Sequence, residues 1–326
     1  MIGKPAQSEG FLTPRIGRDY VWLFVMNALW AVGYPVTAIA LNAGSSPSLL
    51  AALRLTVAFL LFVPFLRRVQ RWSWSLVGLS ALLGILGFAV PLWLQIVGLH
   101  ETDPAIAAIS ISLEPLLTIL AAALITRQRV FWWQKAAVLL ALLGSWILTG
   151  EPRPGHLSHL SGDLALFAAI CCFVLYNVLS PRLTAHTTAP TAAALSFGFG
   201  ALGSVAIWMM SGLPAPSHLS WHLVWSVGFL AFGATGLAYL LWLWVVDQHG
   251  SVTVSALFLY LQPLLGTVLS WVLGEAALTL SLILGGVLVL AAMALGQETH
   301  PFRRPKPAKT MADAGNSLHL PGDPRA

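Results

Sequence analysis

Ten long apolar stretches occupy most of this 326-residue chain and constrain its fold more than any other feature. They lie at approximately 20–41, 48–66, 74–97, 104–126, 133–149, 162–180, 191–211, 222–246, 251–273 and 278–296. A helix needs about 20 mostly apolar residues to cross a bilayer, because lipid offers no partners for backbone amides and carbonyls. The sequence therefore predicts an all-α polytopic membrane protein with ten transmembrane helices and little left over for a soluble domain.

The charge content agrees with a membrane protein. Only 9% of the residues are charged, whereas about a quarter are charged in an ordinary soluble domain. A net charge of +5 would suit nucleic acid if the basic side chains gathered on one solvated face. Here they are spread over loops, so we expect the lipid bilayer as a partner and no nucleic acid. The polar start lacks a convincing cleavage site, and we expect the first stretch to be a retained helix.

The distribution of basic residues predicts the orientation. If the N-terminus is cytoplasmic, all of the 17 Lys and Arg except Arg54 and Arg153 lie on the cytoplasmic side or in loops that face it. The opposite orientation would place these fifteen basic residues outside and leave only Arg153 on the cytoplasmic side. Because Lys and Arg are retained on the cytoplasmic side, we expect both termini in the cytoplasm.

An internal duplication divides the ten stretches five and five at "GEPRPGHLSHLSGD" (150–163). Aligning Pro115 with Pro263 sets Glu114 against Gln262, and aligning Pro47 with Pro190 sets the second stretch against the seventh. Five is odd, so the second copy enters the membrane the other way up. Inverted repeats of this kind recur in secondary transporters, which bind their substrate near the midplane between the halves.

The expected organisation follows from this division. We expect a cytoplasmic N-terminal segment (1–19), a first five-helix repeat (20–149), an external linker (150–161), a second five-helix repeat (162–296) and a disordered cytoplasmic tail (297–326). The tail is rich in proline and polar residues and lacks the apolar content that folding needs.

Three stretches resemble the EamA-type branch of the drug/metabolite transporter superfamily: "LLAALRLTVAFLLFVP", "LFAAICCFVLYNVLSPRL" and "LFLYLQPLLGTVLSWVLGEAAL". The resemblance covers both halves, roughly residues 20–296. It implies a ten-helix inverted-repeat carrier of the inner (plasma) membrane, often an exporter of amino acids or other small metabolites. One position departs from the pattern: Glu275 stands twelve residues after Pro263, whereas Arg127 stands twelve residues after Pro115.

Glu114 is the main candidate for a functional group. Ten residues into its stretch, it lies on the order of 15 Å deep, close to the bilayer centre. A carboxylate there costs several kcal/mol unless it is paired, wet or protonated, and such residues usually line a pathway. We therefore expect Glu114 to line a substrate or proton site; the alternative is a structural ion pair or a protonated hydrogen-bonding group.

Two prolines are predicted helix breaks beside this site. Pro115 leaves the carbonyl of Ile111 without its backbone donor, and Pro263 does the same for Leu259. Free carbonyls at depth must face protein or a wet cavity. We expect both to border a shared central cavity, the alternative being kinks that serve packing alone.

The remaining candidates for a substrate site are polar or aromatic groups at depth. A site for a small organic solute combines aromatic walls with a few hydrogen-bonding groups. Arg54 is either structural or a counter-ion of Glu114. The others, each of which is alternatively a packing residue, are Trp30, Tyr34, Trp93, Gln95, Tyr176, Asn177, Tyr260 and Gln262.

No metal or cofactor is expected. His100, Glu101 and Asp103 cluster in one loop, but their spacing matches no metal motif. Cys171 and Cys172 are adjacent in an apolar stretch, where helical neighbours cannot readily form a disulfide. The chain carries no phosphate-binding glycine-rich loop, which excludes primary ATP-driven transport by this chain alone.

These observations predict a secondary transporter, an exporter or facilitator that moves small organic metabolites such as amino acids by alternating access. Its partners would be a small-molecule solute, the bilayer and protons as a candidate coupling ion; the sequence gives no oligomeric state. A multidrug efflux carrier shares the fold and remains an alternative. An intramembrane enzyme acting on lipid-linked substrates is a weaker one, because a lone deep carboxylate has no nucleophile or acid/base partner at reactive spacing.

Overall fold

The computed structural model describes residues 13–69, 72–102, 104–125, 130–149, 160–216, 218–249, 252–272 and 279–297, and over these ranges the protein is helical without strands. The first half contains α1 (Thr13–Asn42), α2 (Pro47–Phe62), η1 (Val63–Arg68), α3 (Trp74–Gly84), η2 (Ile85–Ala89), α4 (Val90–Glu101), α5 (Pro104–Ile125) and α6 (Trp132–Thr149). The second half contains α7 (Leu160–Thr184), α8 (Ala189–Met210), α9 (Trp221–Phe229), η3 (Leu230–Leu237), α10 (Ala238–His249), α11 (Val252–Leu257), η4 (Phe258–Tyr260), α12 (Leu261–Val272) and α13 (Leu280–Gln297). The all-helical prediction is confirmed.

Six helical segments are long and apolar enough to cross a membrane within the described residues. They are Val21–Asn42, Pro47–Arg68, Trp74–Glu101, Leu160–Thr184, Ala189–Met210 and Trp221–Asp247. Four shorter apolar helices are Ser110–Ile125, Trp132–Leu148, Ser255–Leu269 and Leu280–Gly296. Each of the ten coincides with a stretch predicted from the sequence. The predicted linker and tail lie almost wholly outside the described residues, as does most of the N-terminal segment, so those boundaries stay predictions.

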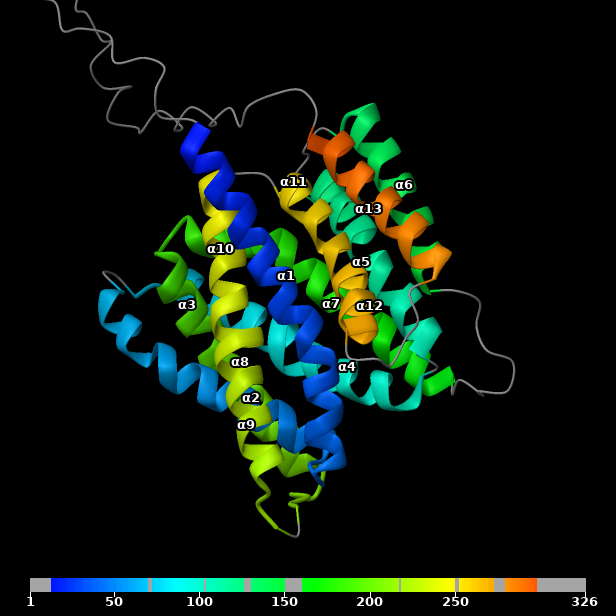
Figure 1. Cartoon of the computed structure of the whole chain (residues 1–326). Helices are drawn as coiled ribbons and strands as arrows, with labels where there is room; N and C mark the ends of the chain where they lie inside the picture. Colours follow the sequence, from blue (N-terminus) through cyan, green and yellow to red (C-terminus); the bar gives the residue numbers. More distant parts are fainter. Residues whose placement is uncertain are drawn as a thin grey trace, which may run out of the picture.

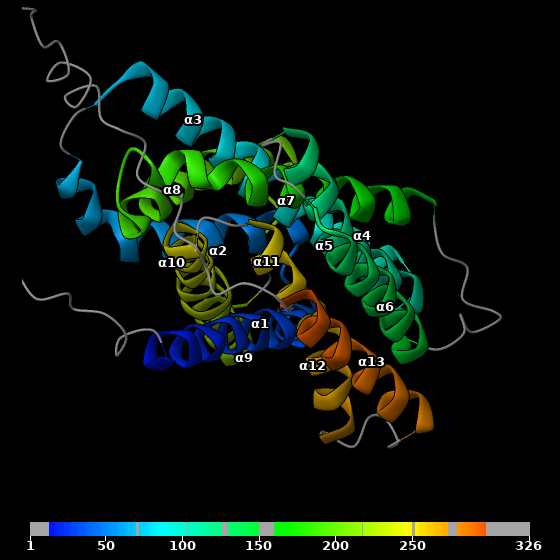
Figure 2. The same ribbon diagram turned by 90° about the horizontal axis from the view of Figure 1, so that it is seen from above.

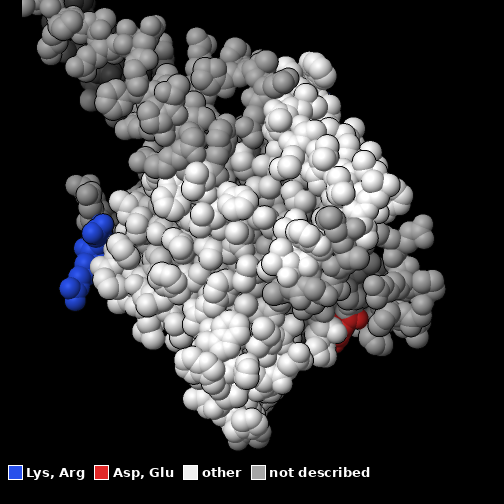
Figure 3. All heavy atoms as spheres, in the orientation of Figure 1, with Lys and Arg blue, Asp and Glu red and all other residues white. Residues whose placement is uncertain are grey.

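The outer surface is apolar. Figure 3 shows a face that is almost entirely uncharged, with basic atoms confined to one edge and acidic atoms to another. Exposed side chains include Leu124, Met210, Leu139 and Phe232, all more than half accessible. Because water disfavours so much exposed apolar area, this surface suits the hydrocarbon of a bilayer.

Short-range sequence signals account for several helix starts. Ser46, Ser73 and Ser220 each accept a hydrogen bond from the backbone amide three residues later, at 3.1–3.2 Å. A serine in this position satisfies one of the amides that a helix leaves without an internal partner. Pro47 follows Ser46 at the first helical position, where its missing N–H does no harm.

The interruptions of the helices differ from the prediction. Pro115 does not break its helix, because α5 continues through it from Pro104 to Ile125. Pro263 lies inside α12, and the irregular turn is the 3-10 segment η4 just before it. Removing a single backbone hydrogen bond does not end a helix whose other turns are well packed. The larger irregularities are the π-helical segments η2 and η3, which the sequence analysis did not predict.

Contacts between helices of the first half and helices of the second half occur in matching pairs. α1 packs on α10 and α12, and α7 packs on α4 and α5. α2 packs on α8, and α6 runs beside α13 (Figures 1 and 2). In the last pair the backbones approach closely: a Cβ built on Gly285 would lie 2.7 Å from the carbonyl oxygen of Gly144. Glycine thus permits the contact between the final helices of the two halves.

Candidate functional site

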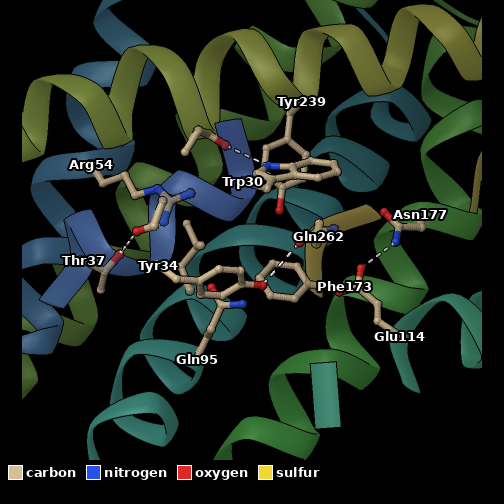
Figure 4. A pocket seen from close by; sticks show the side chains of 13 residues that line it. Trp30, Tyr34, Thr37, Arg54, Gln95, Glu114, Phe173, Asn177, Tyr239 and Gln262 are labelled. Atoms are coloured by element: carbon tan, nitrogen blue, oxygen red, sulfur yellow. Dashed lines mark hydrogen bonds between the residues drawn. The ribbon is translucent and has the colours of Figure 1, made fainter. Parts of the chain in front are cut away.

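A polar pocket lies between the two halves, and it encloses about 520 Å³ of empty space that is partly open to solvent. Figure 4 shows the side chains that point into it. The lining comes from α1, α2, α4, α5, α7, η3, α10 and α12, and comprises Trp30, Gly33, Tyr34, Thr37, Arg54, Leu92, Gln95, Glu114, Phe173, Asn177, Ala234, Tyr239 and Gln262.

An acid–amide pair forms one wall. Asn177 on α7 donates from Nδ2 to Oε1 of Glu114 on α5 over 3.0 Å (Figure 4). Asn177 is buried and Glu114 is partly buried. The amide satisfies one carboxyl oxygen, and the other carboxyl oxygen, Oε2, has no hydrogen-bond partner among the described residues.

A second polar pair has the same construction with the halves exchanged. Tyr34 on α1 donates from its hydroxyl to Oε1 of Gln262 on α12 over 3.3 Å (Figure 4). In each pair the first helix of one half meets the helix that carries the Glu-Pro or Gln-Pro step of the other half. The two pairs differ in charge, because Gln262 stands where the first half has Glu114.

The π-helical segment η3 accepts hydrogen bonds from two further lining residues, Arg54 on α2 and Trp30 on α1. The Nε of Arg54 donates to the hydroxyl of Thr235, and the indole Nε1 of Trp30 donates to the carbonyl of Ala234 over 2.9 Å. A π-turn widens the helix and turns backbone groups away from their usual partners. The hydrogen bonds to η3 therefore hold the guanidinium and the indole at the wall of one cavity.

Aromatic rings complete the walls. Trp30 meets Tyr239 edge to face at a centroid distance of 5.0 Å. Behind them, Phe88 contacts Tyr239 at 4.6 Å and Tyr176 at 4.7 Å. Edge-to-face contacts of this kind fix the ring orientations, so the exposed ring faces in the pocket are held in place.

Seven of the ten residues proposed from the sequence line this pocket: Glu114, Gln262, Trp30, Tyr34, Gln95, Asn177 and Arg54. The other three do not. Tyr176 is buried behind the wall against Gly87, Tyr260 is fully buried in η4, and Trp93 packs on the core. Depth in a helix cannot tell the face toward the cavity from the face toward a neighbouring helix.

The sequence analysis missed several lining residues, including Thr37, Phe173 and Tyr239. Tyr239 is an aromatic hydroxyl deep in an apolar stretch, so the criterion that selected Tyr34 would have found it. Phe173 carries no polar group and gave no signal.

Arg54 and Glu114 are not joined to each other. The polar partner of Arg54 is Thr235 and that of Glu114 is Asn177. Figure 4 shows the two charged side chains on opposite sides of the pocket. The direct ion pair considered from the sequence is therefore not formed, and the two charged groups lie apart with the cavity between them.

No group of three or more His, Cys, Asp or Glu side chains lies within metal-binding reach of one another in the part of the chain described here. Cys171 and Cys172 are free thiols on α7. Neither finding adds chemistry to the pocket.

An all-helical protein with an apolar surface and a polar cavity between its helices has the features of a polytopic membrane protein. The EamA-like transporter family matches residues 18–150 and again residues 160–295. The chain belongs to this family and carries its domain twice in tandem. It is therefore a multi-pass integral membrane transporter rather than an enzyme, and it works on a small molecule in a lipid environment.

Several relatives of the chain are named as transporters, exporters or efflux pumps. The chain is 27% identical over 213 residues to the uncharacterized transporter YyaM of Bacillus subtilis, covering 64% of this chain and 68% of that one. It is 22% identical over 287 residues to the probable amino-acid metabolite efflux pump of Escherichia coli, covering 85% and 93%. The aromatic amino acid exporter YddG of Salmonella typhimurium is 31% identical over 185 residues, covering 54% and 60%. A solved crystal structure superposes with a TM-score of 0.69 at 25% identity, covering 86% of this chain and 96% of that chain.

Proposed function

We propose that this protein is a secondary transporter that exports small organic metabolites such as amino acids across the inner membrane by alternating access through the pocket. The observation that carries the proposal is a cavity with one cationic and one acidic side chain, Arg54 and Glu114, inside an apolar helical bundle. Charged groups at this depth are costly and mark solute or ion pathways. One relative named as a probable amino-acid metabolite efflux pump and one named as an aromatic amino acid exporter support this class of solute.

Alternating access requires two halves that can exchange conformations, and the packing supports this. The contacts of α1 with α10 and α12 mirror those of α7 with α4 and α5, and α3 packs on α8 as α9 packs on α2. The π-helical segments η2 and η3 occur at corresponding places in the third helical unit of each half. A pseudo-twofold axis in the membrane plane between inverted repeats would produce these pairings.

The proposal includes ten crossings with both termini cytoplasmic. Six segments meet the length criterion, and the four shorter apolar helices would complete the ten. The orientation can be tested with single cysteines in a chain whose Cys171 and Cys172 are replaced. Ala185→Cys should react only from the cytoplasmic side and Leu219→Cys only from the outside with a membrane-impermeant maleimide. Labelling of both from the same side would contradict the proposed topology.

Transport is tested with purified protein in liposomes loaded with labelled amino acids. We expect saturable flux of the solute, driven either by its own concentration gradient or by a proton gradient. An absence of flux for every amino acid tested, in both gradients, would contradict the proposal. Flux of lipophilic cations without flux of amino acids would favour a multidrug efflux carrier instead.

Proton coupling is proposed to use Glu114, which lines the pocket and has one carboxyl oxygen bound by Asn177. Glu114→Gln keeps the hydrogen bond with Asn177 possible and removes the titratable group. We expect flux driven by a proton gradient to disappear, whereas exchange of solute at equal pH persists. Glu101→Gln is a matched control, since Glu101 ends α4 and hydrogen-bonds Ser161 outside the pocket. Unchanged proton-driven flux in Glu114→Gln would exclude Glu114 as the coupling residue.

A further inference from the structure

Arg54 has more hydrogen-bonding capacity than its surroundings use. Arg54 is only 6% exposed, and within the described residues its side chain makes one hydrogen bond, from Nε to Thr235. A guanidinium has five N–H donors and stays charged under all conditions in a protein. The four N–H groups on its terminal nitrogens have no partner among the described residues, and the side chain lines the pocket.

Protein carboxylates do not neutralise this cation in the part of the chain that the structure describes. Glu114 is held by Asn177, and Glu101 lies at the end of α4. Asp163 lies in the first turn of α7, and Asp247 lies exposed near the end of α10. A buried charge is stable when a charge-assisted partner satisfies it. The planar fork of an arginine fits a carboxylate or phosphate oxygen pair best.

We infer that Arg54 forms an anion subsite in the pocket and that, with Glu114 as the opposite subsite, it selects solutes carrying both an acidic and an amino group. This inference rests on the proposed transport through the same pocket. The acidic group of the solute would meet the two terminal nitrogens of Arg54. The ammonium group would meet the second oxygen of Glu114, Oε2, which Asn177 leaves unused.

The charge balance favours a zwitterion over other solutes. One arginine and one carboxylate face the cavity, so a solute with both charges leaves the pocket neutral. A simple cation would leave Arg54 unpaired, and a simple anion would place a second negative charge opposite Glu114. In a cavity of low dielectric constant such unpaired charges are strongly unfavourable.

The aromatic walls take the remainder of the solute. Trp30 and Tyr239 are fixed edge to face beside the two charged groups (Figure 4). Their ring faces can pack against an apolar side chain, and they add attraction for an ammonium group. Thr235 is a positioning residue here, because its hydroxyl holds the guanidinium in place from η3.

The test uses four forms of one compound: phenylalanine, its N-acetyl derivative, its amide, and the N-acetyl amide. Each competes for flux of labelled phenylalanine in proteoliposomes. We expect at least a tenfold loss of competition when either charged group is blocked. Arg54→Gln should abolish the preference for the free acid over the amide, and Glu114→Gln should abolish the preference for the free amine over the acetylated form. Arg67→Gln, an exposed arginine in η1, is the matched control and should keep both preferences.

The outcomes separate this inference from the proposed function. Flux of phenylalanine with equal competition by all four forms would overturn the inference and leave transport intact. Absence of flux for labelled phenylalanine and for every other labelled amino acid would contradict both. If Arg54→Gln does not fold, the comparison of the four compounds on the unaltered protein still decides, and Arg54→Lys tests whether a cation without the planar fork retains the preference for the free acid.

Discussion

Replacing Thr235 by valine isolates the contribution of one buried hydrogen bond. Thr235 is fully buried, and its hydroxyl accepts from the guanidinium of Arg54. Valine has nearly the same shape, so the substitution removes the acceptor without opening a cavity. The chain offers a matched control in Thr118 on α5, which is also fully buried but whose hydroxyl has no partner among the described residues.

The two substitutions are expected to change the free energy of unfolding in opposite directions. A hydrogen bond to a charged group contributes about 1.5–3 kcal/mol to stability, and Thr235→Val loses it. Thr118→Val removes a buried polar group that makes no bond, which is neutral or stabilising by about 1 kcal/mol. The two variants should therefore differ by roughly 2–4 kcal/mol in the free energy of unfolding. Thr235→Ser keeps an acceptor and should lie close to the unaltered protein.

The assay is thermal unfolding of the purified protein in detergent. A change of 1 kcal/mol shifts Tm by about 2 °C in a chain of this size, so Thr235→Val should unfold roughly 3–6 °C lower. Transport supplies a second readout, because a displaced guanidinium should raise the solute KM in Thr235→Val but not in Thr235→Ser. Equal Tm values for Thr235→Val and Thr118→Val would refute the assignment of a supporting role to Thr235.

Three further predictions concern packing and helix geometry. Gly285→Ala would bring a methyl group within 2.7 Å of the Gly144 carbonyl oxygen. Overpacking of this kind costs about 1–3 kcal/mol of stability. Gly266→Ala is the control, because nothing lies within 4 Å of a Cβ built there, and its Tm should be no lower than that of the unaltered protein. Trp30→Phe loses the donor to the carbonyl in η3 and should lower Tm by about 2 °C, while an unchanged Tm and solute affinity would show that the bond is dispensable. Pro115→Ala restores a backbone donor within the continuous α5 and should raise Tm; a fall would mean that the proline ring itself stabilises the native state.

Local patterns predicted the helices well for physical reasons. Stretches of about 20 apolar residues can satisfy their backbone in lipid only as helices, and ten such stretches coincide with the helical segments. Serine before an apolar run marked where helices begin, as at Ser46 and Ser73. The π-helical segments η2 and η3 were not predicted, because their extra residue is accommodated by contacts with other helices such as that of Gly87 with Tyr176.

The candidate site was predicted in part. Glu114 and Arg54 were selected because a charge at depth is costly, and this reason does not depend on which face of the helix carries it. Tyr176 and Tyr260 satisfied the same criterion of depth but lie behind the pocket. The direct pairing of Arg54 with Glu114 was also considered from their depths alone, whereas Thr235 and Asn177 are the partners.

By itself the sequence determined that the chain is helical and apolar on its outside, that it carries two related halves, and that a carboxylate and a guanidinium lie inside. These properties follow from transfer free energies and backbone satisfaction, which act on each segment separately. The tertiary structure decided which side chains face one cavity and which hydrogen bonds hold them. That outcome depends on the rotation of each helix about its axis, and the rotation is set by close contacts between helices that are distant along the chain.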